Sequence, residues 1–320
     1  MSSTARRTAG AGFSLIEMLV SLVIAALLIV GAVTMYSQSR TTYRAAEAAA
    51  RLQETARYAL SFVETDLRMA NYWGLNSRPD YIQDGGLTVN ACSAGWATDF
   101  DNYVQGFNDK KGLACLQAAD YARGDVLVVR RAATDRETGL LDQNVVYLQT
   151  SRIQGTLFLA AAGCKATDES CLPSGYLPPQ SETHRLLAHA YYLNPNSTGR
   201  AGVPSLRRLR LVGGPLAQSE EIIPGIEDMQ LEFGIDTDFN ATAEFYVAPE
   251  IALPAGARIV SVRVWLLVRA EEPDFQFIDG RTYNYAGKSF TPVAAGNQNR
   301  YRRLLVSKTI QLRNTRYDGT

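Results

Sequence analysis

The chain has 320 residues, and its 32 lysines and arginines balance its 32 aspartates and glutamates. This balance gives no global charge of the kind that attracts nucleic acid or an anionic surface. Beyond the N-terminal segment, the length suffices for one large domain or two small ones.

A long apolar segment follows a short polar leader at the N-terminus. The leader contains Arg6 and Arg7, and Glu17 is the only charged residue from Phe13 to Tyr36. A bilayer-spanning helix needs ~20 apolar residues, so this segment is long enough to span. It is too long for the core of a secretory signal peptide and has no small-residue cleavage site behind it. Arginines before the span predict a cytoplasmic leader and export of the rest of the chain.

The single carboxylate in this span, Glu17, is unusual. A charge inside a membrane span costs roughly 2.5–3.5 kcal/mol on insertion scales, so we expect a functional role rather than a stray charge in a signal anchor. If the chain were cut between Gly12 and Phe13, the new α-amino group would lie one helical turn from Glu17. Opposite charges attract far more strongly in an apolar medium than in water, and pairing removes the cost of burying each alone.

The stretch Gly12–Glu17, GFSLIE, resembles the class III leader of type IV prepilins and type II secretion pseudopilins. The resemblance implies that a membrane prepilin peptidase cuts after Gly12 and N-methylates Phe13. It further implies that Glu17 neutralises the terminal amine of a neighbouring subunit during filament assembly. The implied fold is a long N-terminal helix packed on a β-sheet head.

The helical pattern continues past the membrane segment, because no Gly or Pro occurs from Ser37 to Ala70. Small and apolar residues recur there at helical spacing. This stripe comprises Ala45, Ala49, Leu52, Ala56, Ala59, Val63, Leu67 and Ala70. We therefore predict a leader (1–12), a membrane half-helix (13–36) and an amphipathic half-helix (37–71). The alternative for the second half is an ordinary core helix of the head.

Residues 72–320 are predicted to form a β-rich periplasmic or extracellular head. The segment 74–124 is rich in Gly, Asn, Asp and aromatic residues, which indicates surface loops. Eight apolar or alternating runs bounded by turn residues then predict strands. These runs are Asp125–Arg131, Asn144–Thr150, Thr156–Ala160, Leu186–Leu193, Leu206–Val212, Ile226–Ile235, Arg258–Ala270 and Arg302–Arg313. The pattern favours a mostly antiparallel sheet with one face on a core, and hence an α+β fold.

Four cysteines accord with export to an oxidising compartment. They allow three pairings. The local pairs Cys92–Cys115 and Cys164–Cys171 are favoured, because each closes a short loop of turn-rich sequence. A structural zinc site would need another grouping of ligands, since the chain has no C-x-x-C motif.

Motifs of catalysis are missing from the sequence. It contains no nucleophile elbow, phosphate loop, H-E-x-x-H or dinucleotide fingerprint. Its only histidines, His184 and His189, lie on or beside an apolar strand-like run, so we expect structural roles for both. We predict a protein that is not an enzyme and needs no cofactor.

Asp236, Asp238 and Asn240 stand at alternate positions, as at the start of a calcium loop, and Glu244 could follow as a ligand. Ca²⁺ binds oxygen ligands in such a spacing. Ala241, however, replaces the glycine of the sharp turn, and no glutamate stands at the twelfth position. A polar hairpin turn without a metal is the favoured interpretation, with calcium as the alternative.

Two groups of arginines could form a phosphate-binding face. They are Arg207, Arg208 and Arg210, and Arg300, Arg302 and Arg303. Leucines alternate with the first group, as in a half-solvated strand. An exposed strand or a subunit interface is therefore favoured over contact with nucleic acid.

Head segments narrow the resemblance to PilW-type minor pilins of type IVa pili, namely Asp66–Gly74, Ile226–Asp236 and the end of the last strand at Leu312–Asn314. The resemblance implies a complex with other minor pilins (PilV-, PilX-, PilE- and FimU-like) and a PilY-type tip adhesin. This complex would prime assembly of the major pilin at the inner-membrane assembly platform and would support twitching motility and adhesion. The protein would move from the inner membrane to the pilus tip at the cell surface.

Two alternatives remain at this stage. One is a J-like pseudopilin of a type II secretion system, for which the head here is larger than expected. The other is a single-span periplasmic binding protein that uses the β-rich head as a receptor. Such a receptor would need neither the cut between Gly12 and Phe13 nor Glu17.

Overall fold

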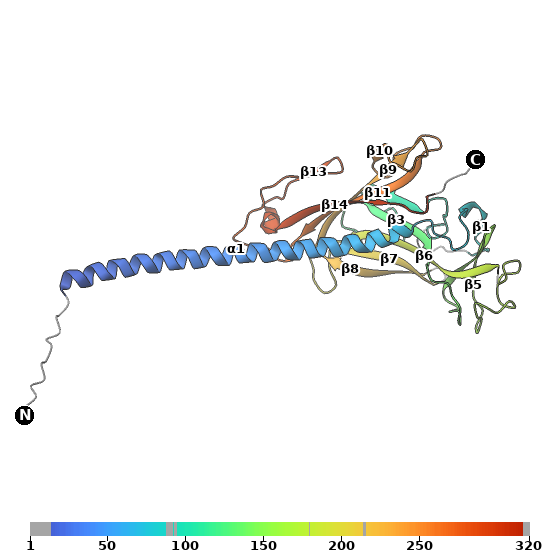
Figure 1. Ribbon diagram of the computed structural model, residues 1–320, viewed down its shortest axis with the longest axis horizontal. Coiled ribbons are helices and arrows are strands. Elements are labelled where there is room, and N and C mark those ends of the chain that lie inside the picture. Colours follow the sequence, from blue (N-terminus) through green and yellow to red (C-terminus); the bar gives the residue numbers. More distant parts are fainter. Residues whose placement is uncertain (1–13, 88–91, 93–94, 179, 214–215, 316–320) are drawn as a thin grey trace, which may run out of the picture. The chain divides into compact units, whose positions relative to one another are not determined.

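The computed structural model describes residues 14–87, 92, 95–178, 180–213 and 216–315. The chain divides into two compact units, Met1–Ala50 and Arg51–Thr320. Helix α1 (Leu15–Met69) belongs to both units and is continuous in the helical assignment (Figure 1). The long N-terminal helix is thus confirmed, with ends within two residues of the predicted ones.

Helix α1 ends where Asn71 adopts a left-handed backbone conformation (φ 62°). Asparagine tolerates this conformation after a helix C-terminus better than most residues. The Asn71 side chain is fully used, because it donates to the carbonyl of Asn314 and accepts from Nε1 of Trp73. The end of the helix is therefore hydrogen-bonded to Asn314.

In the second unit, one face of α1 is buried. The buried side chains include Leu52, Ala56, Ala59, Val63 and Leu67, as the predicted stripe requires. The same stripe is exposed at Ala49, two residues before the second unit begins at Arg51. Helical periodicity therefore predicted the buried face correctly, and packing begins at Leu52.

The larger sheet has eight strands, and all of its pairings are antiparallel except that of β1 with β5. The longest strand, β6, pairs with β4, β3 and β7 along its length and so joins the two parts of the sheet. The strand order is β1 (Ile82–Gln83), β5 (Gly155–Leu159), β4 (Val146–Ser151), β6 (Ser181–Asn194), β3 (Val126–Ala132) and β2 (Val104–Phe107), with β7 (Ser205–Gly213) and β8 (Leu216–Pro224) attached through β6.

The smaller sheet is antiparallel throughout. Its order is β10 (Phe245–Val247), β9 (Ile226–Asp236), β11 (Arg258–Arg269) and β14 (Arg303–Gln311). A separate hairpin joins β12 (Tyr283–Tyr285) to β13 (Lys288–Phe290). Short 3₁₀ helices cover Pro79–Tyr81, Ala118–Asp120 and Ala295–Arg300.

One hydrophobic core contains side chains from α1 and from both sheets. Val63 and Leu67 of α1 share it with Leu127 of the larger sheet and with Met229 and Val264 of the smaller one. The helix therefore packs against both sheets and completes the core of the second unit. This arrangement confirms the α+β, pilin-like fold class.

All eight predicted strands are present, but several further strands had no sequence signal. Strand β6 begins at Ser181 instead of the predicted Leu186. The polar side chains at its start have hydrogen-bond partners within the sheet, because Gln149 of β4 donates to Ser181 and accepts from Thr183. Strand β8 is rich in polar residues and pairs with β7. Polar strands of this kind lack the apolar alternation from which strands are predicted.

The prediction of surface loops for residues 74–124 is wrong in part. Trp96, Phe100, Leu113 and Leu116 from this segment are buried. They join clusters with strands of the larger sheet, such as Val128 of β3. Irregular backbone can still contribute core side chains, which composition alone does not reveal.

Candidate assembly interface

The start of α1 centres on one carboxylate, that of Glu17. The backbone N–H of Ser14, the residue before the helix, donates a hydrogen bond of 3.0 Å to Oε2 of Glu17. This is half of a capping box, in which a glutamate in the first turn binds an N–H that the helix leaves unpaired. Gly12 and Phe13, the predicted cleavage and methylation residues, lie outside the described residues.

The first half of α1 exposes apolar side chains on every side. Leu15 is 82 % exposed and Met35 is 75 % exposed, and the large apolar residues between them are 49 to 70 % exposed. The helix is long and apolar enough to cross a membrane. Apolar surface of this extent requires lipid or other helices as its surroundings.

In the second unit, a buried carboxylate attaches α1 to the larger sheet. Asp66 is 2 % exposed. Its Oδ1 accepts from Nη2 of Arg131 on β3 at 2.8 Å, and its Oδ2 lies 2.5 Å from Nδ1 of His189 on β6. The hydroxyl of Tyr191 donates to the same Oδ2 at 2.5 Å. One side chain of the helix therefore binds three side chains of the sheet.

These partners determine the ionisation of Asp66. Burial by itself raises the pKa of the carboxyl, because it disfavours the charged form. The hydrogen bond and charge of His189, the charge of Arg131 and the hydrogen bond from Tyr191 outweigh burial, so the net pKa lies well below the ordinary value. Asp66 is therefore a carboxylate throughout the physiological pH range, and it stabilises the contact between helix and sheet.

Sequence reasoning did not identify this cluster, although a signal was present. Asp66 lies on the same helical face as Val63, Leu67 and Ala70, which are buried. A charged residue on the apolar face of a helix requires a buried partner. The partner itself could not be inferred, because Arg131 and His189 come from distant parts of the chain.

Both histidines are held by hydrogen bonds within the protein, which agrees with structural roles. His189 binds Asp66, as described above. Nδ1 of His184 lies 2.9 Å from the carbonyl oxygen of Ala133, and its ring packs edge-on against Tyr72. These partners come from the β3 region and from the end of α1, so both rings connect parts of the head.

Two disulfides close loops of the head, Cys92–Cys115 and Cys164–Cys171. They are the two local pairings that the sequence favours. The first lies in the cluster that contains Trp96 and Val128. The second closes a loop beside Tyr147 and Phe158 on strands β4 and β5.

Replacing both cysteines of the first disulfide should destabilise the head more than replacing those of the second. The two bonds span 23 and 7 residues, and a longer loop gains more freedom in the unfolded chain. The chain-entropy relation gives losses of about 3 and about 2 kcal/mol. Urea unfolding of the alanine pair variants measures the difference, and an equal or reversed ranking would contradict it.

The acidic residues that follow β9 converge in the structure. Ligand oxygens of Asp236, Asp238 and Glu244 lie within 4.8 Å of one another. The side chain of Asn240 donates to Asp238 and accepts from the backbone N–H of Thr242. Asp236 accepts hydrogen bonds from the backbone N–H groups of Phe239 and Ala241, and Glu244 accepts from Thr237. These bonds describe a polar hairpin turn that is satisfied by its own backbone.

We expect millimolar calcium to leave the melting temperature of the protein unchanged relative to a chelator-treated control. The acidic oxygens already serve backbone donors, so a cation would compete with them. A cation that binds the native state raises the melting temperature by mass action. A rise that disappears in Asp238→Asn would show that the hairpin binds calcium after all.

Each of the six arginines considered for phosphate binding has an acidic or carbonyl partner within the chain. On β7, Arg207 pairs with Glu221 and Arg210 with Glu220 of β8. Arg303 is fully buried and binds Glu227 at 2.6 Å. The remaining contacts are Arg208 with Glu220, Arg302 with Asp274, and Arg300 with the carbonyls of Phe275 and Phe277. These arginines therefore connect strands and loops.

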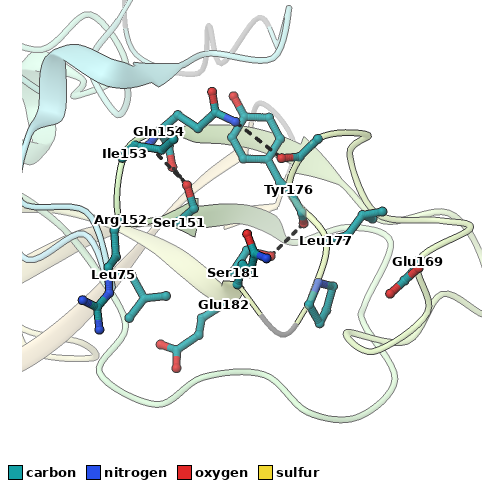
Figure 2. A pocket seen from close by; sticks show the side chains of 13 residues that line it. Leu75, Ser151, Arg152, Ile153, Gln154, Glu169, Tyr176, Leu177, Ser181 and Glu182 are labelled. Carbon is teal, nitrogen blue, oxygen red and sulfur yellow. Dashed lines mark hydrogen bonds between the residues drawn. The ribbon is translucent and has the colours of Figure 1, made fainter.

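A hollow of about 830 Å³ lies between the turn after β4 and the segment that leads into β6 (Figure 2). Tyr176 and Ser181 are joined there by a hydrogen bond of 2.8 Å, and Ile153 is 75 % exposed at the turn. The charged side chains Arg152, Glu169 and Glu182 also line it. The hydroxyls of Ser151, Tyr176 and Ser181 in this lining bind carbonyl oxygens rather than a carboxylate, so we assign no chemistry to the hollow.

Two family models match separate parts of the chain. The prokaryotic N-terminal methylation motif matches residues 7–33, which contain Glu17 and the start of α1. The model for type IV pilus-assembly protein W, PilW, matches residues 190–314. No curated protein and no solved structure matches the chain significantly.

The two matches support a PilW-like protein of the type IV prepilin family. The PilW match begins near the end of β6 and includes β7 to β14, so it contains the whole smaller sheet. Two of the three head segments that resemble PilW lie inside it, while Asp66–Gly74 precedes it.

The family resemblance supports a general role in the type IV pilus, without specifying partners. A PilW-like prepilin has the role of a minor pilin in the type IV pilus, and this family is structural rather than enzymatic. The resemblance to this family implies association with other pilins and with the pilus machinery. The methylation motif and the apolar helix indicate membrane anchoring followed by incorporation into the pilus.

Proposed function

We propose that this PilW-like protein joins a low-copy complex of other minor pilins and a PilY-type tip adhesin, which primes type IV pilus assembly. The proposal rests on one observation: the same chain has a prepilin-like leader with Glu17 and a head that resembles PilW. A leader alone would fit any pilin or pseudopilin. The head is what favours a minor pilin of the pilus over a secretion pseudopilin.

The proposed pathway begins in the inner membrane, with the leader in the cytoplasm and the head in the periplasm. The prepilin peptidase cuts between Gly12 and Phe13 and methylates the new amine of Phe13. The exposed apolar residues of α1 then pack among the helices of other pilins, and Glu17 pairs with the amine of a neighbouring subunit. The finished complex stays at the pilus tip, where it supports twitching motility and adhesion.

The leader and α1 are expected to act as separate parts of this pathway. Residues 1–12 direct processing, 13–36 enter the membrane and then the filament, and 37–71 connect this span to the head. The head, 72–320, carries the contacts that distinguish this subunit from other pilins. The proposal therefore places recognition in the head and polymerisation in the helix.

A deletion strain tests the proposal, with surface pili, twitching and exoenzyme secretion scored together. Loss of pili and twitching with normal secretion is the expected result, and a plasmid copy of the gene should restore both. Loss of secretion with intact pili would instead identify a secretion pseudopilin. That outcome would overturn the assignment of partners.

A further inference from the structure

Strand β14 forms a long and regular edge of the smaller sheet. Among the described strands it pairs with β11 alone, and its nine residues do so in one uninterrupted register. The other nine-residue edge strand, β8, is paired through two register shifts, which distort its edge. Among the described strands, the remaining sheet edges have four residues or fewer. A long, flat edge is a template for another strand.

The register identifies which backbone groups of β14 face outward. At one end of the pairing, the N–H of Ala270 binds the carbonyl of Arg302. At the other end, the N–H of Leu312 binds the carbonyl of Val260. Hydrogen-bonded positions of an antiparallel pair recur at every second residue. The even-numbered residues of β14 therefore bind β11, and the odd-numbered residues face the open edge.

Three odd-numbered residues, Leu305, Ser307 and Thr309, carry the open part of this edge. Within the described part of the chain, no group binds their backbone N–H or C=O. Arg303 differs, because its carbonyl accepts from Arg281. The edge thus presents a donor and an acceptor at every second residue, which is the pattern that an added strand requires.

A groove of about 390 Å³ lies between this edge and α1. Its apolar lining comes from Ala56 and Leu60 of the helix and from Leu304 and Val306 of the strand. Successive side chains of a strand point to opposite faces, so every second side chain of an added strand would enter the groove. Arg57 also lines the groove, is exposed and has no ion pair among the described residues.

Lysine on an edge strand often prevents further pairing, and β14 contains Lys308. Here the ammonium group of Lys308 binds Glu64 of α1 at 2.5 Å. The ion pair holds the lysine against the helix, on the face of the strand that lines the groove. The charge of the lysine is thereby partly neutralised by a residue of this chain.

We propose that β14 accepts an extended segment of another subunit of the minor-pilin complex as an additional strand. Every second side chain of this segment is apolar and lies in the groove, and one acidic side chain pairs with Arg57. Main-chain hydrogen bonds supply affinity in such strand addition, and pockets for alternate side chains supply specificity. The proposal rests on the proposed function, because it takes its partner from the same pilus complex.

Photo-cross-linking in the native bacterium tests the contact with the full-length chain. A photoreactive amino acid replaces Ser307 or Thr309, one at a time, and Thr134, an exposed residue after β3, serves as the control position. We expect both edge positions to capture the same segment of one pilus subunit, at residues two apart in its sequence. Capture of this chain's own residues 316–320, of a second copy, or of no pilus subunit would overturn the proposal.

The matched variants Ser307→Pro and Ser307→Ala test the hydrogen-bond ladder. Proline removes an outward N–H that β11 does not use, so the fold should tolerate it, whereas alanine keeps the N–H. Loss of a ladder bond and the bulk of the proline ring should reduce cross-linking from Thr309 at least about tenfold. Alanine should leave the yield unchanged, and equal yields in the two variants would contradict strand addition.

Two controls distinguish loss of the β14 contact from misfolding and from failure of the proposed function. The melting temperature of each purified full-length variant shows whether Ser307→Pro folds, and Arg57→Glu weakens the same contact from the helix side without changing β14. A deletion strain with normal pili would refute the proposed function. A deletion strain without pili, in which Ser307→Pro still assembles pili as the wild type does, would refute the β14 contact alone.

Discussion

Glu17→Ala is expected to yield a protein that is processed and inserted in the membrane but is not incorporated into pili. The substitution would leave the terminal amine of a neighbouring subunit without its partner in an apolar environment. An unpaired charge there costs roughly 2.5–3.5 kcal/mol, which corresponds to about a hundredfold in the assembly equilibrium. Immunoblots of sheared pili measure incorporation, and mass spectrometry of the N-terminus measures processing.

Two further variants at this position separate charge from shape. Glu17→Gln keeps the size and the ability to accept from the N–H of Ser14, but it has no charge, so it should fail as Glu17→Ala does. Glu17→Asp keeps the charge and should retain part of the incorporation. Normal incorporation of Glu17→Ala or Glu17→Gln would refute the charge-pairing account.

Asp66→Asn is expected to have the largest effect on the stability of the head. The variant would leave Arg131 on β3 and His189 on β6 without their carboxylate, inside a core where water cannot replace it. Removal of one partner from a buried charged cluster costs about 3–5 kcal/mol. Urea unfolding of the full chain in detergent, followed by tryptophan fluorescence, measures the loss; two of the three tryptophans, Trp73 and Trp96, are buried in the head.

Asp135→Asn is the matched control for this variant, because Asp135 is exposed. Surface substitutions of this kind usually change the free energy of unfolding by less than about 0.5 kcal/mol. If Asp66→Asn were no more destabilising than Asp135→Asn, the cluster would not be what holds α1 to the sheet.

The same residue makes stability depend on pH in a defined direction. The pKa of Asp66 is lower in the folded protein than the value of about 3.9 expected in the unfolded chain. Its stabilisation is therefore complete above about pH 4 and is lost as the pH falls through the folded-state pKa. Between pH 5 and pH 2, the free energy of unfolding should therefore fall further for the wild-type protein than for Asp66→Asn. An equal fall in the free energy of unfolding of the two proteins would contradict this role of Asp66.

The sequence predicted the features that depend on neighbours along the chain. The leader GFSLIE with Glu17, the absence of Gly and Pro from Ser37 to Ala70 and the alternating runs of the head are local patterns. A helix repeats its contacts every three to four residues and a strand every two, so such patterns specify elements directly. Loop length likewise favoured the two disulfides that the structure contains.

Strands without apolar alternation and core residues within loops were not predictable in this way. The polar start of β6 forms a strand because Gln149 of β4 satisfies Ser181 and Thr183 beside it. Trp96 is buried because the disulfide-closed segment folds back on β3. In both cases the partner is a residue on another element, which single-segment patterns do not contain.

By itself, the sequence determined a prepilin-type N-terminus, one long helix and an antiparallel β-rich head, since each is encoded in short-range periodicity or in a contiguous motif. Only the tertiary structure decided that Asp66 meets His189 and Tyr191, which are 123 and 125 residues away. It alone also placed β14 at an open edge beside α1. Contacts across such separations depend on how the helix and both sheets pack around one core, and no local pattern specifies that packing.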